Sequence, residues 1–312
     1  MRDIFHNFSD NSVKLIRKVY QKIPPPFNYG YHFLQYSNWL KKTQWLPEED
    51  IKIIQEKLFL KLIRHAYSQV PYYKTLFQKN GISLSEIKSL DDIHKIPIMT
   101  KEDIRNNFPQ LIAYNYKTYS PSLHHTSGST GEPVHYYIDK KLSALISSIV
   151  WRHWNWCGIK YNDKIAVFRG TLINEFGKKA PCYYRIDNNG KQLHFSTFHM
   201  NDSVMDKYIN KLNSYKPDLI RGYPASLEIL SNFIVNNNKS IIKPKAIHTS
   251  SEMLLPSQRK IIEQAFGAPV FDWYSHGEST VAAGECEQHS GLHLNSEFGY
   301  TEFIPENSID ST

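Results

Sequence analysis

Residues 202–274 constrain the fold more than any other part of the chain. Three stretches repeat apolar residues every three or four positions, and each is followed by a short apolar run: PDLIRGY, KAIHTSS and PVFDWY. The first pattern is typical of amphipathic helices and the second of buried strands. Pro224 and Pro256 suit the first turns of two helices, and Gly267 suits the end of the second. This alternation predicts an α/β fold with parallel strands and crossover helices.

Two further strands and a helix are predicted before this segment. The runs at 134–139 and 164–170 have strand-like composition, and the apolar stretch 142–156 between them suits a helix. We therefore predict an α/β core over residues 111–312, with mostly parallel sheets flanked by helices.

The first 110 residues are predicted to form a helical lead-in packed on this core. A helix is expected between Pro47 and Pro71, because acidic residues at 48–50 favour its positive end. Ser85 and Thr100 are expected to cap shorter helical turns, although neither begins a full capping box. The stretch IPPPFNYGYHF at 23–33 predicts a surface segment without helix.

Composition limits the partners and the compartment. The 312 residues are 41% hydrophobic and 21% charged, which indicates a packed globular protein. The formal charge of +7 suits an anionic ligand, a nucleic acid or a membrane surface, but the scattered basic residues argue against nucleic acid. Three cysteines indicate a reducing compartment. No stretch has the length of a signal peptide core or an integral membrane segment, so we expect a cytoplasmic protein.

Polar residues follow the last two predicted strands, at the edge where parallel sheets bind ligands. They are Ser250, Ser251 and Glu252 after one strand, and Tyr274, Ser275, His276, Gly277 and Glu278 after the next. Because both loops leave the same edge, we expect them to form one site. A carboxylate such as Glu278 is also common as a solvated charge or a helix cap, and Tyr274 alone would suit a core position.

The loop HHTSGSTGEP, residues 124–133, is a candidate phosphate-binding loop. Its glycines let backbone amides turn outward, and Ser127, Ser129 and Thr130 add hydroxyl donors. Gly128 and Gly131 have only two residues between them and no lysine follows, so the loop is not a Walker A motif. A hairpin tip has a similar composition, and the loop alone does not decide between the two.

A zinc site is a second candidate. Cys286, His289 and His293 have a spacing that could hold zinc, and His276 and Cys182 could supply further ligands. The chain has 14 histidines and no C-x-x-C motif, so incidental surface histidines are the alternative.

Together these stretches resemble the adenylate-forming superfamily, and within it phenylacetate–coenzyme A ligases and their capsular-polysaccharide-associated relatives. The resemblance covers residues 50–304. The stretches that carry it are, in order, HAYSQVPYYKTLFQKNGI with SLDDIHKIPIMTKEDIR, TSGSTGEP, KPDLIRGYPASLEIL, HTSSEMLLPSQRKIIEQAFGAPVFDWYSHGES and AAGECEQHSGLHLNSEFGYTEFI.

This resemblance implies ATP-dependent adenylation of a small-molecule carboxylic acid, with coenzyme A as a candidate acyl acceptor and a role in polysaccharide or capsule biosynthesis. It implies that Thr126, Ser127, Gly128, Ser129, Thr130 and Gly131 wrap the ATP phosphates. Ser250, Ser251 and Glu252 would border the adenine, Tyr274 would stack on it, and Ser275, His276 and Gly277 would complete the nucleotide site. Glu278 would bind Mg²⁺, and Thr126 and Glu278 would be the catalytic residues.

The chain departs from the family pattern inside the site. It has Tyr-Ser-His-Gly-Glu at 274–278 where the family has Tyr-Gly-x-Thr/Ser-Glu, so a hydroxyl before the glutamate is lost. Glu132 stands where the phosphate loop often has lysine, and a carboxylate there repels phosphate unless it points away.

The chain stops at Thr312, before the ribose-binding aspartate, the hinge and the C-terminal lid with its catalytic lysine. We therefore expect a truncated product, a split gene or a fragment, with the lid absent or supplied by a separate chain. The alternative function is a catalytically impaired fragment that binds a nucleotide or a partner.

Overall fold

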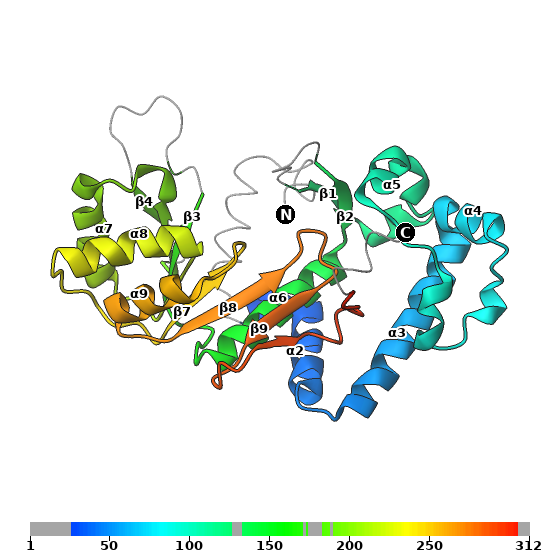
Figure 1. Cartoon of the computed structure of the whole chain (residues 1–312), viewed down its shortest axis with the longest axis horizontal. Helices are drawn as coiled ribbons and strands as arrows, with labels where there is room; N and C mark the ends of the chain where they lie inside the picture. Colours follow the sequence, from blue (N-terminus) through cyan, green and yellow to red (C-terminus); the bar gives the residue numbers. More distant parts are fainter. Residues whose placement is uncertain (1–25, 127–132, 171–172, 174–182, 188–189, 305–312) are drawn as a thin grey trace. The chain divides into compact units, whose positions relative to one another are not determined.

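The computed structural model describes residues 26–126, 133–170, 173, 183–187 and 190–304. Contacts divide the chain into two units (Figure 1). The first comprises Met1–Leu34, Val150–Ser275 and Ala283–His293, and the second comprises Gln35–Ile149, His276–Ala282 and Leu294–Thr312. The boundary expected near residue 110 lies within the second unit, and the division into a lead-in and a core stays a prediction.

The first unit is built on an eight-stranded sheet with the order β10-β9-β8-β7-β6-β3-β5-β4. The strands are β3 (Ile165–Arg169), β4 (Tyr184–Ile186), β5 (Gln192–Ser196), β6 (Leu219–Gly222), β7 (Ala246–Ser250), β8 (Val270–Ser275), β9 (Ala282–Glu285) and β10 (Leu292–Leu294). β5, β3, β6, β7 and β8 pair in parallel, and β4 pairs antiparallel with β5. The predicted parallel α/β fold is confirmed.

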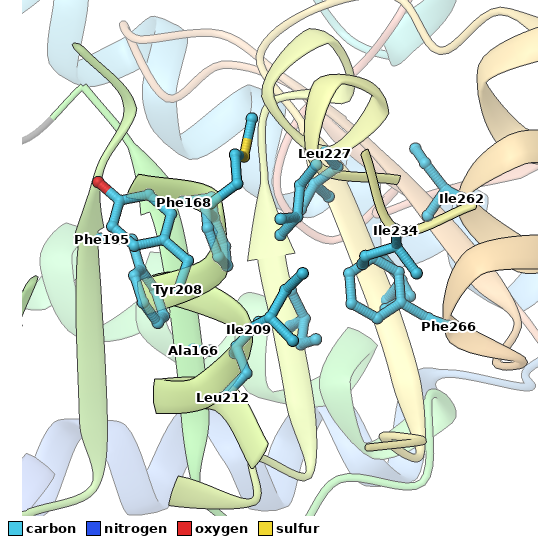
Figure 2. Close-up of a cluster of buried hydrophobic side chains, with 14 of the residues drawn as sticks. Ala166, Phe168, Phe195, Tyr208, Ile209, Leu212, Leu227, Ile234, Ile262 and Phe266 are labelled. Atoms are coloured by element: carbon cyan, nitrogen blue, oxygen red, sulfur yellow. The ribbon is translucent and has the colours of Figure 1, made fainter. Parts of the chain in front are cut away.

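Three crossover helices cover one face of this sheet: α7 (Asp202–Tyr215), α8 (Pro224–Asn236) and α9 (Pro256–Phe266). Their apolar faces and the sheet form the main core (Figure 2). Phe168 and Phe195 stack with ring centres 4.4 Å apart, and Tyr208 of α7 packs beside them. Gly267 ends α9 with φ +63°, a left-handed conformation that favours glycine.

The helix α6 (Lys140–Trp156) follows the predicted stretch 142–156 and packs against the opposite side of the sheet through its last turns. His153 contacts His248 of β7 and the Glu285 carbonyl of β9. The ring of His153 also lies 4.9 Å from that of Trp273 on β8. This second face therefore carries polar and aromatic side chains in addition to buried aliphatic ones such as Val167 and Leu219.

In the second unit, α3 (Glu48–Gln69) confirms the helix predicted between Pro47 and Pro71. Pro71 does not end the helical region, because it is the first residue of α4 (Pro71–Lys79), where its missing N–H is tolerated. The hairpin of β1 (Ser122–His125) and β2 (His135–Ile138) belongs to the same unit.

Three local expectations need correction. The cap near residue 85 is Ser83, whose side chain accepts from the Ser85 amide. Thr100 does cap α5 (Lys101–Asn106), and it forms a capping box with Asp103, because Asp reaches back to the cap amide as Glu does. The helix α2 (Tyr31–Thr43) begins inside the segment expected to lack helix.

Short 3-10 helices connect the remaining segments: η1 (Phe27–Tyr29), η2 (Leu84–Glu86), η3 (Leu90–Lys95), η4 (Phe108–Leu111), η5 (Tyr116–Tyr119) and η6 (Thr197–His199). Across the described ranges, no helix combines the length and the apolar character that crossing a membrane requires. The described cysteines, Cys157 and Cys286, are both buried and free.

Candidate functional site

In the first unit, the carboxyl ends of β7 and β8 carry part of the predicted site. Ser250 is the last residue of β7 and is almost fully buried, and its Oγ accepts a hydrogen bond from Arg169 Nη2 at 2.5 Å. Ser251 follows with φ +73°, an unusual conformation for a residue with a side chain, which marks a sharp turn out of the strand. Tyr274, on β8, is half exposed. Each of these residues leaves the sheet at its ligand-binding edge.

Glu252 has a structural contact in addition to its predicted place beside adenine. Its carboxylate accepts a hydrogen bond from the Ala225 amide at 3.2 Å. Ala225 lies in the first turn of α8, where amides have no partner within the helix and where negative charge is favourable. Glu252 therefore ties the loop after β7 to the start of α8.

In the second unit, Thr126 fixes the base of the candidate phosphate loop. Its amide donates to the Val134 carbonyl at 3.0 Å, and its hydroxyl accepts from the Val134 amide at 3.0 Å. These two bonds continue the β1–β2 ladder past His125 and His135. The loop residues Ser127, Gly128, Ser129, Thr130, Gly131 and Glu132 lie outside the described residues.

The segment that bears Glu278 is a tight turn held by its own backbone. The His276 amide donates to the Val281 carbonyl at 3.3 Å, and the Ser279 amide donates to the His276 carbonyl at 3.2 Å. His276 Nδ1 also lies 3.2 Å from the Thr280 hydroxyl. The side chain of His276 is thus directed to the turn itself.

Gly277 places this turn against the β1–β2 hairpin. A Cβ atom at Gly277 would lie 3.4 Å from the Tyr136 hydroxyl and 3.9 Å from Thr126 Cγ2. Gly277, next to Glu278, therefore lies close to Thr126, where the glycine-rich loop begins. The structure brings together two predicted site segments that are about 150 residues apart in the sequence.

Glu278 is partly exposed and, in the part of the chain that the structure describes, its carboxylate has no hydrogen bond or ion pair. Burial, and then the charge of Glu278, raise the pKa of the Tyr136 hydroxyl. A carboxylate without a partner among the described residues suits Mg²⁺, which binds proteins through one or two carboxylates together with substrate phosphates. The described residues hold no cluster of three or more metal-ligating side chains.

The zinc alternative gains no support in the described residues. His293 Nε2 lies 3.2 Å from Cys286 Sγ, but His289 turns to Glu285, with Nδ1 at 3.3 Å from Oε2. The ring of His289 also packs on Phe271. Cys182 lies outside the described residues, and no three-ligand cluster is found elsewhere in them.

Arg221 and Tyr136 had no assigned role in the sequence-based site. Arg169 and Arg221 come at the ends of otherwise apolar strands. Because arginine is rarely buried without a partner, an arginine in such a strand could have indicated a functional residue. The sequence carries no comparable signal for Tyr136. Its neighbour Tyr137 has the same side chain, and only the register of the hairpin determines which of the two faces which partner.

Comparisons with known proteins identify relatives of the chain. The chain is 26% identical over 234 residues to Protein CapK of Staphylococcus aureus, a match covering 73% of this chain and 51% of that protein. It is 25% identical over 272 residues to a phenylacetate-coenzyme A ligase of Aromatoleum evansii, covering 85% and 60% respectively. The chain is a homologue of Protein CapK and of phenylacetate-coenzyme A ligases.

Solved structures of adenylate-forming ligases share this fold. A 2-hydroxyisobutyryl-CoA ligase in complex with 2-HIB-AMP and CoA superimposes with a TM-score of 0.58 at 19% identity, over 79% of this chain and 54% of that chain. No family model matches the sequence. The chain spans between 51% and 60% of the length of the curated relatives that it matches.

Proposed function

We propose that the chain takes part in the ATP-dependent adenylation of a carboxylic acid. The observation that carries this proposal is that Gly277 lies close to Thr126 and Tyr136. This places the turn bearing Glu278 near the start of the glycine-rich loop, so a metal-binding carboxylate and a phosphate loop would serve one nucleotide. Homology to acid–coenzyme A ligases supports the same reaction.

In the proposed reaction, an oxygen of the acid's carboxylate bonds to the α-phosphorus of ATP, and the bond from that phosphorus to the bridging oxygen breaks. The products are an acyl-AMP and pyrophosphate. Mg²⁺ bound by Glu278 would neutralise the phosphate charge. Thr126 and the loop amides of Ser127–Gly131 would orient the β- and γ-phosphates through hydrogen bonds. The net charge of +7 favours capture of two anionic substrates.

The remaining assignments belong to the same proposal. Ser250, Ser251 and Glu252 would border the adenine, and the exposed ring of Tyr274 would stack on it. Ser275, His276 and Gly277 would line the nucleotide. We propose coenzyme A as the acyl acceptor, polysaccharide or capsule biosynthesis as the process, and the cytoplasm as the compartment. A C-terminal lid domain would come from further sequence or from a separate chain.

Exchange of labelled pyrophosphate into ATP tests the proposal, because it requires reversible adenylation but no acyl acceptor. With an acid that supports exchange, Glu278→Gln should lower the rate by about 100-fold at fixed Mg²⁺. Glu287→Gln, at an exposed position, is the matched control and should retain the wild-type rate. Undiminished exchange in Glu278→Gln would refute the role of Glu278.

Calorimetry with ATP and Mg²⁺ separates the proposed enzyme from the alternative. ATP binding without exchange, across a panel of acids, would favour a nucleotide-binding fragment. Absence of both binding and exchange would refute a nucleotide site in this chain.

A further inference from the structure

Two arginines stand on the face of the sheet opposite α7, α8 and α9. Side chains alternate between faces along a strand. Ile220 of β6 belongs to the main core, so Arg221 lies on the other face. Arg221 pairs with Val167 of β3, and Arg169 is two residues further along β3, on the same face. The two arginines therefore occupy neighbouring parallel strands near their carboxyl ends.

Aromatic rings and one hydroxyl contact the two guanidinium groups. Arg169 donates to the Ser250 hydroxyl and lies 5.9 Å from the centre of the Tyr223 ring. Arg221 lies 5.2 Å from the centre of the Trp154 ring. Cation–π contacts of this kind offset part of the cost of burying a charge.

Among the residues that the structure describes, no acidic side chain neutralises the pair. Within the described ranges, neither Arg169 nor Arg221 forms an ion pair, and the Nε atom of each is buried without a hydrogen-bond partner. A buried donor without a partner is rare in folded proteins and often marks a place where a ligand or an ion belongs.

The surrounding groups make this region positively charged. Burial, and then the charge of Arg169, lower the pKa of Arg221 to about 9, so it remains protonated at pH 7. His248 pairs with Arg221 across the sheet. Burial, and then the charges of His153, Arg221 and Arg169, hold the pKa of His248 well below its usual value. His248 is therefore neutral, and no described residue supplies a counter-charge to the two guanidinium groups.

Two unneutralised guanidinium groups are unfavourable until an anion joins them, and the planar fork of arginine matches carboxylate and phosphate. The reacting carboxylate is a poor candidate, because pairing with two cations would reduce its basicity and so its power to attack phosphorus. We propose that Arg169 and Arg221 bind a second anionic group, a carboxylate or a phosphate, on the acid that is adenylated. The inference rests on the proposed function and specifies its substrate class as a dianionic acid.

Ligand binding without ATP tests the proposal independently of catalysis. The probes are phenylacetate, its para-carboxylate and its para-phosphonate, titrated by calorimetry into the full chain. We expect at least one dianion to bind about tenfold or more tightly than phenylacetate, and the two dianions distinguish carboxylate from phosphate. Equal affinity for all three probes would overturn the proposal.

Substitutions test whether the two arginines cause the tighter binding of a dianion than of phenylacetate. Arg221→Met and Arg169→Met should each abolish this preference, and Arg221→Lys should retain part of it because the charge remains. Arg185→Met is the matched control, since Arg185 is an exposed arginine on β4 of the same sheet, and it should keep the preference. A dianion preference that persists in both Arg221→Met and Arg169→Met would also overturn the proposal. Methionine removes an unpaired charge from a partly buried position, so these variants should fold, which circular dichroism checks.

Pyrophosphate-exchange assays with the same probes separate the failure of the anion site from the failure of the proposed adenylation. Arginine-dependent binding of a dianion without exchange by any acid would refute adenylation and leave the anion site in place. Exchange with phenylacetate and none with either dianion would refute the anion site and leave adenylation in place.

Discussion

His153 of α6 and His248 of β7 lie with their ring nitrogens 3.2 Å apart inside the first unit, although they are 95 residues apart in the sequence. His153 Nε2 lies 2.8 Å from the Glu285 carbonyl, which requires a proton on that nitrogen. Nδ1 of His153 then accepts, and His248 donates. This contact joins α6 to the sheet through two neutral imidazoles.

We predict that stability falls between pH 6.5 and pH 5 because of this pair. Burial lowers the pKa of His153 to about 4, and the pKa of His248 lies well below its usual value. The unfolded chain, with ordinary histidine pKa values, binds protons in this range while the folded chain does not, so stability is full above pH 6.5 and declines as the pH falls. His153 alone should contribute a loss of about 2 kcal/mol at pH 5.

Urea unfolding at several pH values measures this effect. His153→Asn cannot titrate and should show a shallower loss between pH 6.5 and pH 5. His94→Asn, at an exposed position, is the control and should keep the wild-type slope. Equal slopes in wild type and His153→Asn would contradict the prediction.

We predict that Gly222→Ala destabilises the first unit. An added Cβ would lie 2.7 Å from the Phe168 carbonyl oxygen and 2.9 Å from Phe168 Cβ, and a backbone atom of a central strand cannot move aside cheaply. The expected loss is about 2 kcal/mol. Gly170→Ala is the matched control, because a Cβ added there would lie 3.5 Å from the Phe198 ring, an ordinary van der Waals distance. Thermal unfolding compares the two, and an equal effect of both changes would count against the argument.

We predict that Glu285→Ala lowers the free energy of unfolding by about 3 kcal/mol, as expected when one partner of a buried ion pair is removed. The Glu285 carboxylate accepts from Arg259 Nη2 at 2.6 Å and from the Asp272 amide at 2.9 Å. Burial alone would raise the pKa of Glu285, but these hydrogen bonds outweigh it and lower the pKa. Glu285→Gln should cost less, since its amide oxygen still accepts from one donor. The urea midpoints of the two variants measure their stability. A larger loss of stability in Glu285→Gln than in Glu285→Ala would contradict the prediction.

We predict a small loss of stability, about 0.5 kcal/mol, for Glu252→Ala. The carboxylate accepts from the Ala225 amide at the positive end of α8, and the position is exposed, so solvent and salt screen the interaction. The loss should shrink in high salt. A loss of several kcal/mol that is insensitive to salt would show that Glu252 has another structural partner.

Much of the fold could be predicted from the sequence because its signals are local. The helix from Glu48 needed only an acidic first turn and an apolar repeat. The alternation over 202–274 predicted α7, α8 and α9 and three parallel strands. The cap at Ser83 was missed because Ser83 and Ser85 have the same side chain, and the choice depends on which one reaches a free amide.

The candidate site was predicted less completely. Sequence patterns indicated the loops after β7 and β8, and the resemblance supplied the nucleotide roles of Thr126 and Glu278. The contact of Gly277 with Tyr136 did not follow from any pattern, because the two residues are far apart in the chain and their approach depends on how the turn packs on the hairpin.

By itself, the sequence determined the elements and their order, since hydrophobic period, proline and glycine act within a few residues of one another. The tertiary structure alone decided which strands became neighbours. β3 lies between β5 and β6, and this placement brings Arg169 beside Arg221 without an acidic partner among the described residues. The physical reason is that a strand's apolar pattern specifies which face is buried but not which strand pairs with it. The charge of the proposed anion site therefore depends on a strand pairing that local sequence does not encode.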